Sequence, residues 1–185
     1  MRRSFAIPLL LCAVFADAQA AGFRLSSPEI GPDRPLPQRF EFDGFGCHGE
    51  NRSPALRWDG APAGTRSFAV TVYDPDAPTG SGWWHWVVVD LPATVHDLPA
   101  GAGAVDGRAL PLPAKQIRTD YGAPGFGGAC PPTGDRPHRY VFTIHALKVD
   151  ALGLPADATA AMAGYMIRAN ALGHATFTVR YGRSR

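Results

Sequence analysis

Charged residues are scarce in this chain. Only 18% of its 185 residues are Asp, Glu, Lys or Arg, and the formal net charge is +2. Soluble domains usually carry about 25% charged residues. The lysines, Lys115 and Lys148, stand alone, and the sequence has no basic run or stripe. We therefore expect no nucleic-acid partner, because such partners are bound through clustered basic side chains.

Long helical patterns are also rare, whereas glycine and proline are abundant. The chain has 21 Gly and 18 Pro, a composition that argues against a coiled coil or a helical bundle. Hydrophobic residues make up 45% of the sequence, which is enough to fill a core and argues against disorder. The length predicts one domain.

The sequence has no apolar run of the roughly 20 residues that a membrane span needs. A shorter apolar stretch occupies 5–15, follows an arginine pair and precedes a small-x-small motif that ends at Ala20. This pattern predicts a signal peptide over 1–20 and a single mature domain over 21–185. The alternative is an N-terminal core strand or helix. Export would place the protein in the periplasm or outside the cell.

Cysteine is rare, with three in the chain. Removal of the signal peptide takes away Cys12 and leaves Cys47 and Cys130. Because an exported protein meets an oxidising compartment, we expect these two to form a disulfide. The alternative is a pair of buried free thiols.

Strand-like segments dominate the rest of the chain. They are rich in β-branched and aromatic residues and are bounded by Gly, Pro and Asp. The run 83–91 is almost wholly apolar, so both of its faces should be covered. In 140–147 the even-numbered residues should share one face of the strand. The complete set of predicted strands is 39–42, 68–73, 83–91, 140–147 and 176–181.

One segment has helical spacing. Asp157 is a suitable N-cap, and Gly173 is a natural residue just past the end of the helix. The apolar stripe between them should pack against a sheet; it consists of Met162, Tyr165, Met166, Ala169 and Leu172. Many strands and a single helix imply a mostly β domain of packed sheets.

A turn with two carboxylates follows the predicted strand 68–73. Pro75 and Pro78 end that strand and restrict the backbone, so Asp74 and Asp76 are held in place. Such carboxylates can take part in a site. Alternatively, they cap backbone N–H groups within the turn, as Asp residues often do.

Two histidines lie near strand starts. His85 stands among tryptophans, and His138 precedes Arg139 after a long loop. A histidine beside an arginine suits anion binding. The structural alternatives are a hydrogen-bonded core histidine for His85 and a surface histidine beside a salt bridge for His138.

The connections 94–120 and 121–137 exceed the usual loop length, and such loops are often functional. Within the second, the glycine-rich stretch 125–132 could expose backbone amides that form an anion-binding nest. This signal is weak by itself, since no strand–loop–helix pattern supports a phosphate-binding loop.

Taken together, these motifs resemble the phosphatidylethanolamine-binding protein family, and more closely its bacterial Raf-kinase-inhibitor-like branch. The resemblance extends over 23–183. It is carried by Tyr73-Asp74-Pro75-Asp76-Ala77-Pro78, by Trp84-His85, by Gly127-Gly128 with Pro131-Pro132, by His138-Arg139-Tyr140, by the spacing from Cys47 to Trp58, and by Tyr181-Gly182-Arg183.

The resemblance implies a large central β-sheet packed on a smaller one, and a small pocket for a phosphate-type anion or a phospholipid headgroup. In that pocket Asp74 would accept a hydrogen bond from an imidazole and favour its protonated form. Binding should then strengthen as the pH falls through about 6 to 7. Asp76 should be structural. The implied ligand-binding residues are Asp74, Trp83, His85, Gly128, Pro132, His138 and Tyr140.

The resulting hypothesis is an exported, non-enzymatic binding protein without cofactor or metal. The resemblance also implies a protein partner such as a serine protease, and a homodimer is compatible with it. The chain ends soon after 176–181, so we expect the C-terminal helix that borders the pocket in eukaryotic relatives to be missing. The alternative function is a hydrolase in which Asp74, His85 and His138 act as acid–base groups or metal ligands.

Overall fold

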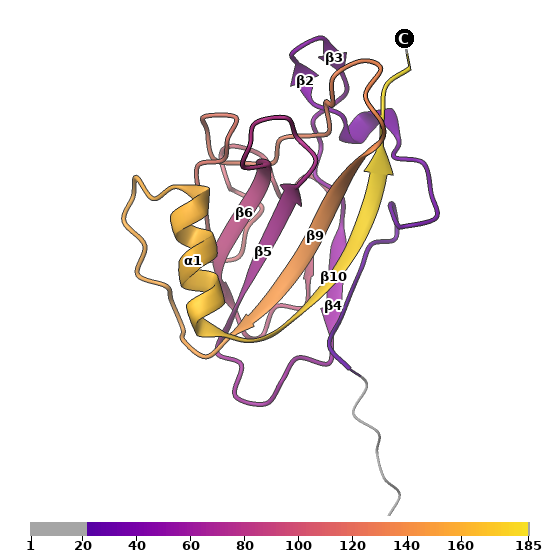
Figure 1. Cartoon of the computed structure of the whole chain (residues 1–185). Helices are drawn as coiled ribbons and strands as arrows, with labels where there is room; N and C mark the ends of the chain where they lie inside the picture. Colours follow the sequence, from indigo (N-terminus) through magenta and orange to yellow (C-terminus); the bar gives the residue numbers. More distant parts are fainter. Residues whose placement is uncertain (1–21, 185) are drawn as a thin grey trace, which may run out of the picture.

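The structure is a computed structural model that describes residues 22–184. The predicted signal peptide 1–20 lies outside the described residues. A five-stranded antiparallel sheet forms the centre of the molecule, in the order β10-β9-β5-β6-β8 (Figure 1). Its strands are β5 (Ser67–Asp74), β6 (Trp83–Pro92), β8 (Lys115–Gln116), β9 (His138–Leu147) and β10 (Ala171–Tyr181).

A three-stranded sheet packs on one face of this central sheet. It has the order β1-β4-β7 and contains β1 (Arg24–Ser26), β4 (Leu56–Asp59) and β7 (Asp97–Leu98). The main core lies between the two sheets, where Trp58, Phe68, Trp86 and Phe142 are buried. The prediction of a large sheet packed on a smaller one is therefore confirmed.

Three smaller elements complete the fold. The hairpin β2 (Asp43–Gly44) and β3 (Cys47–His48) lies at one end of the molecule, after the 3₁₀ helix η1 (Gln38–Phe40). The helix α1 (Ala160–Asn170) covers part of the other face of the central sheet (Figure 1). The part of the chain that the structure describes contains no helix long and apolar enough to cross a membrane.

The alternation of side chains along the central strands follows the sequence pattern. Trp86 and Val88 of β6 enter the main core, whereas Val87 and Val89 pack into a second cluster beneath α1. This confirms that β6 is covered on both faces. In β9, the even-numbered Tyr140, Phe142 and Ile144 all face the main core, as predicted.

The predicted ends of the helix were wrong. Thr159 is the N-cap instead of Asp157, because its hydroxyl accepts a hydrogen bond from the Met162 N–H. The helix ends at Asn170, because Ala171 is already extended and pairs with Leu147 of β9. Gly173 therefore does not follow the helix directly. It lies in β10, beside an irregularity in the strand register.

The predicted packing face of the helix was also largely wrong. Tyr165 and Met162 are 73% and 47% exposed, and Leu172 lies beyond the helix. The buried face consists of Ala160, Ala163 and Ile167, with Met166 at its edge. Small alanine side chains let the helix lie close to the sheet, a fit that a hydrophobicity pattern does not reveal.

The segment 39–42 is not a strand as predicted. Its first part belongs to η1, and only Glu41 forms an isolated bridge, with Ala129. Phe40 is buried in the main core, so its apolar character reflects burial and not strand pairing. The last predicted strand, 176–181, begins earlier than expected, at Ala171.

Candidate functional site

The antiparallel order of the central sheet brings three candidate segments to one end of it. β5 ends at Asp74, while β6 begins at Trp83 and β9 begins at His138. Both β6 and β9 pair with β5, and Asp74 lies opposite Trp83 in the register. Neighbouring antiparallel strands run in opposite directions, so the end of β5 meets the starts of its two neighbours.

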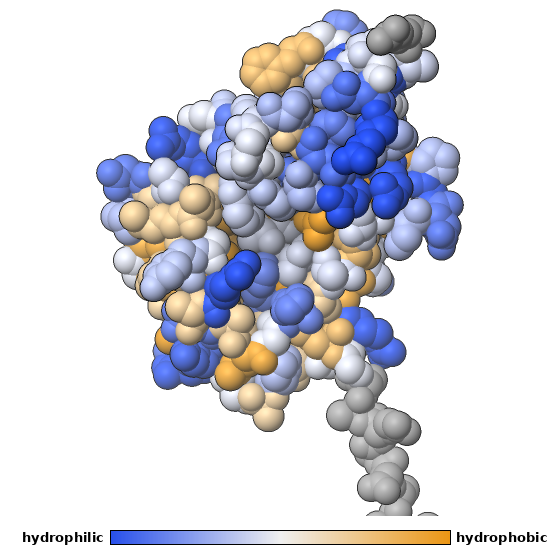
Figure 2. All heavy atoms as spheres, in the orientation of Figure 1, coloured by the Kyte–Doolittle hydropathy of each residue, from blue (hydrophilic) through white to orange (hydrophobic). Residues whose placement is uncertain are grey.

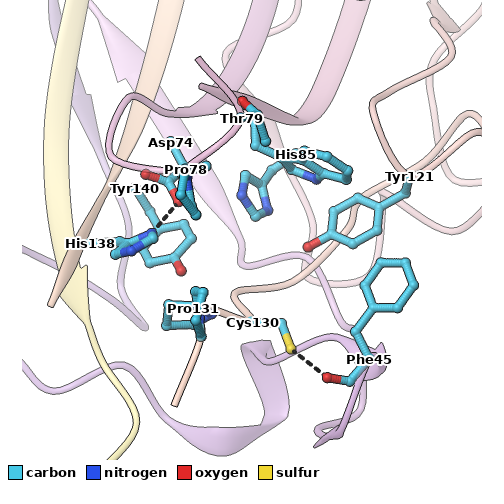
Figure 3. A pocket seen from close by; sticks show the side chains of 13 residues that line it. Phe45, Asp74, Pro78, Thr79, His85, Tyr121, Cys130, Pro131, His138 and Tyr140 are labelled. Atoms are coloured by element: carbon cyan, nitrogen blue, oxygen red, sulfur yellow. Dashed lines mark hydrogen bonds and ion pairs between the residues drawn. The ribbon is translucent and has the colours of Figure 1, made fainter. Parts of the chain in front are cut away.

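A cavity of about 180 Å³ opens at this end of the sheet. In Figure 3 Asp74, His138 and Tyr140 lie on one side of it, and Tyr121 and Phe45 lie on the other. Six of the seven residues that the sequence analysis selected line the cavity: Asp74, Trp83, His85, Pro132, His138 and Tyr140.

A buried hydrogen bond joins Asp74 and His138. The Nδ1–H of His138 donates to Asp74 Oδ2 over 2.7 Å, and each side chain is only 4% exposed. The other carboxylate oxygen of Asp74 accepts from the Asp76 backbone N–H over 2.8 Å. The bond to Asp74 fixes the orientation of the His138 ring. Its Nε2 is left for other partners and lies 3.5 Å from Asp135 Oδ2.

His85 is held differently. Its Nδ1–H donates to the Gly127 carbonyl over 2.8 Å, and its ring meets those of Tyr121 and Tyr140 edge to face. Burial lowers the pKa of His85 below its usual value of 6.5. The ring is therefore neutral near pH 7, and its Nε2 carries a lone pair instead of a proton. Of the two histidines, only His138 makes the hydrogen bond to a carboxylate that was expected to stabilise an imidazolium.

The glycine-rich loop does not form the predicted amide nest. The Gly127 N–H donates to the His85 carbonyl and the Ala129 N–H donates to the Phe40 carbonyl. The Gly128 N–H donates to Asn51 Oδ1 over 2.7 Å, and Gly128 is not among the residues that line the cavity. Glycine is required there because a Cβ would lie 2.3 Å from the backbone of Glu41.

Arg139 and Asp76 pair with each other outside the cavity. Asp76 accepts hydrogen bonds from the Arg139 backbone and guanidinium over 2.8–2.9 Å. These bonds, with Arg136 nearby, hold the pKa of the Asp76 carboxyl well below its usual range. The pairing agrees with a structural role for Asp76. It also removes Arg139 from the anion-binding role that its place beside His138 suggested.

Other residues also line the cavity, and among them Phe45, Thr79 and Tyr121 were not selected from the sequence. The Tyr121 hydroxyl donates to the Gly128 carbonyl over 2.8 Å, and burial raises the pKa of this hydroxyl. The only sequence feature that could have pointed to Tyr121 is its position as an aromatic residue where the long connections 94–120 and 121–137 meet.

Trp83 lines the cavity and carries a buried indole N–H. Its indole N–H is buried and finds no acceptor with hydrogen-bond geometry in the described part of the chain. The Tyr121 ring lies beside it, with centroids 5.4 Å apart. A buried donor without an acceptor costs about 1–3 kcal/mol.

A disulfide joins the β2–β3 hairpin to the rim of the cavity. Cys47 and Cys130 are bonded, with their Cα atoms 5.9 Å apart, as the sequence analysis expected. The hairpin carries Phe45, which is 73% exposed and lines the cavity entrance. The bond therefore fixes an aromatic side chain beside the opening.

The fold and the site define a class: a two-sheet β protein with a small cavity, lined by imidazole and carboxylate groups, at one end of its central sheet. The profile described as phosphatidylethanolamine-binding protein matches residues 26–182. The chain belongs to the phosphatidylethanolamine-binding protein family.

Bacterial proteins are among its relatives. The chain is 50% identical over 179 residues to the UPF0098 protein YbcL of Escherichia coli, covering 97% of this chain and 98% of that one. It is 48% identical over 158 residues to the E. coli UPF0098 protein YbhB, covering 85% and 99%. The crystal structure of E. coli YbcL, described as a new member of the mammalian family, matches with a TM-score of 0.85 and 53% identity over 88% of this chain and 99% of that one.

Replacing Cys47 and Cys130 together by serine should lower the free energy of unfolding by about 4 kcal/mol. The cysteines are 83 positions apart, and closing a loop of this size removes considerable entropy from the unfolded chain. Chemical denaturation of the oxidised protein and the double variant measures the difference. Reduced wild-type protein serves as the control and should resemble the variant. Alkylation of both cysteines in the unreduced folded protein would disprove the bond.

Proposed function

We propose that this chain is an exported, non-enzymatic binding protein whose cavity holds a phosphate-type anion, including the headgroup of a phospholipid. The observation that carries the proposal is the convergence of His85, His138 and Asp74 at one cavity of about 180 Å³. Such a volume suits a headgroup better than a large ligand, because pockets for drug-sized molecules are usually about 300–1,000 Å³.

The cavity can hold an anion without a basic surface patch. His138, held through Nδ1 by Asp74, can donate to a ligand oxygen once its Nε2 is protonated, and the Tyr140 hydroxyl also lines the space. Both carboxylate oxygens of Asp74 already accept hydrogen bonds, one from His138 and the other from the Asp76 backbone. Asp74 therefore presents no unpaired oxygen to a bound anion. Hydrogen bonds from a protonated imidazole to an oxyanion are charge-assisted and stronger than neutral ones.

The state of His85 sets the protonation chemistry of binding. Its Nδ1–H is committed to Gly127, so the neutral ring would present a lone pair to an oxyanion. A bound anion raises the pKa of His85 by its own charge. His85 then takes up a proton at Nε2 and donates a hydrogen bond to the ligand. Binding of a fully ionised ligand is thus coupled to proton uptake.

Export is supported by two features of the chain. The segment 1–20 has the pattern of a secretion signal, and the cysteines that remain after its removal pair as a disulfide. Disulfides persist in oxidising compartments such as the periplasm. We propose a periplasmic or secreted location on this basis.

The structure adds nothing in favour of the hydrolase alternative. Cys130 is in a disulfide, and the Thr79 hydroxyl donates to the Gly82 carbonyl instead of an imidazole. Within residues 22–184, His, Cys, Asp and Glu side chains form no group of three that could hold a metal ion. A protein partner such as a serine protease is supported by the family resemblance alone.

Replacing either cavity histidine by alanine should weaken the binding of phosphoethanolamine about tenfold or more. Each change removes a charge-assisted hydrogen bond. Isothermal titration calorimetry on His85→Ala, His138→Ala and the double variant measures the loss, and thermal unfolding checks that each variant is folded. His96→Ala, an exposed histidine outside the cavity, is the matched control and should bind normally. Normal binding by a folded double variant would refute the site.

Affinity for glycerophosphoethanolamine should increase as the pH falls from 8 to 5. This phosphodiester keeps one negative charge over the range, so any change comes from the protein. The sign follows from His85: burial lowers its pKa in the free protein, and the ligand charge raises it in the complex. Affinity therefore rises by up to about tenfold per pH unit between those two pKa values and levels off below the lower one.

Calorimetry in two buffers of different ionisation enthalpy should show net proton uptake at pH 7. His85→Gln should remove most of the pH dependence of the residual binding. An affinity that is constant from pH 8 to pH 5, without proton uptake, would contradict the role given to His85.

A further inference from the structure

A second cavity lies on the face of the central sheet opposite the main core. It has a volume of about 520 Å³ and is bounded by α1 and by strands β5, β9 and β10. Figure 2 shows this face of the molecule, which is hollowed near its middle beside α1. The volume falls within the range of about 300–1,000 Å³ that is usual for small-molecule pockets.

The floor of this second cavity is a polar patch on neighbouring strands. Thr71 of β5 lies opposite Thr143 of β9, and His145 of β9 lies opposite His174 of β10. His145 Nε2 and Thr71 Oγ1 are 3.0 Å apart. The two imidazole rings have centroids 6.3 Å apart. Hydroxyl and imidazole groups therefore lie together where a ligand could contact several of them.

The charge around the second cavity is positive. Arg168 of α1 lines it, and no carboxylate does. Burial, followed by the nearby His174 and Arg168, lowers the pKa of His145 to about 4, so that ring is neutral near pH 7. No described carboxylate forms an ion pair with Arg168 within 4.0 Å, unlike Arg139, which pairs with Asp76.

One wall of the second cavity is flat and apolar. It is formed by the Trp84 indole and by Ile167 of α1. Gly164 lets the helix approach the indole closely, since a Cβ there would lie 3.2 Å from a Trp84 ring carbon. Glycine inside a helix costs about 1 kcal/mol relative to alanine, and here it allows this close packing.

From this arrangement we infer that the second cavity binds a small organic anion. A carboxylate or phosphate head would contact Arg168 and His174, beside the paired Thr71 and His145 side chains. A planar or aliphatic body would lie against Trp84. An aromatic face, an unpaired guanidinium and the absence of lining carboxylates together favour an anionic ligand over a cationic or neutral one. This inference does not depend on the Asp74–His138 cavity.

Titrations followed by amide NMR spectra of the isotope-labelled protein would test this inference. Benzoate and phenyl phosphate serve as the anionic probes, with benzyl alcohol and inorganic phosphate as controls for the apolar body and the anionic head. Saturable shifts should be confined to amides of α1, β9 and β10 around the cavity. The probe that binds more tightly, benzoate or phenyl phosphate, shows whether the cavity prefers a carboxylate or a phosphate head. Benzyl alcohol and inorganic phosphate should bind at least fivefold more weakly than the corresponding anionic probe.

Arg168→Gln should weaken benzoate or phenyl phosphate binding at least fivefold. The side chain is exposed, so the fold should be retained. Arg180→Gln, which changes an exposed arginine of β10 outside this cavity, is the matched control. His138→Ala should leave this binding unchanged and so separates it from the first cavity.

Three results would overturn the inference. One is the absence of saturable shifts around the cavity with both anionic probes. Another is binding of benzyl alcohol as tight as that of the anionic probes, which would show that the cavity accepts an apolar ring without selecting for negative charge. The third is equal loss in Arg168→Gln and Arg180→Gln, which would show only general charge attraction.

Discussion

The hydrogen bond between Asp74 and His138 is the constraint on which the candidate site depends. It joins the end of β5 to the start of β9, and both side chains are almost completely buried. A buried carboxylate is costly unless it is paired, and Asp74 is satisfied by His138 and by the turn that follows it. The same turn carries Asp76, whose pairing with Arg139 fixes it to β9 from outside the cavity. The imidazole is thereby placed at the cavity before any ligand arrives.

The two histidines of the site share a cavity but differ in chemistry. His138 is oriented by a carboxylate, whereas His85 is oriented by a backbone carbonyl and is deeply buried. Burial lowers the pKa of His85, so this ring is neutral near pH 7 in the protein without a bound anion. We propose that the charge needed for an anion arrives as a proton during binding. This would explain how a chain of net charge +2 could hold an anion without a basic surface.

The sequence was informative where a local pattern determines the structure. Alternation along 140–147 and the apolar run 83–91 predicted the central strands and the faces they bury. Prediction from the sequence failed where contacts between segments far apart in the chain determine the structure. The Gly128 amide is taken by Asn51, which lies far away in the chain. The face of α1 is set by how closely Ala163 and Gly164 approach the sheet. Tyr121 lines the cavity beside Pro131 and Pro132 of the same long connection, a placement that no local pattern predicts.

The most direct test of the central claim observes the imidazole nitrogens themselves. Long-range proton–nitrogen NMR spectra of the protein at pH 7 distinguish protonated from unprotonated ring nitrogens. In the free protein we expect His85 to carry its proton on Nδ1 and to lack one on Nε2. Addition of inorganic phosphate should protonate His85 Nε2 and shift the signals of His138. A proton already on His85 Nε2 in the free protein, or spectra of both rings that saturating phosphate leaves unchanged, would contradict the account.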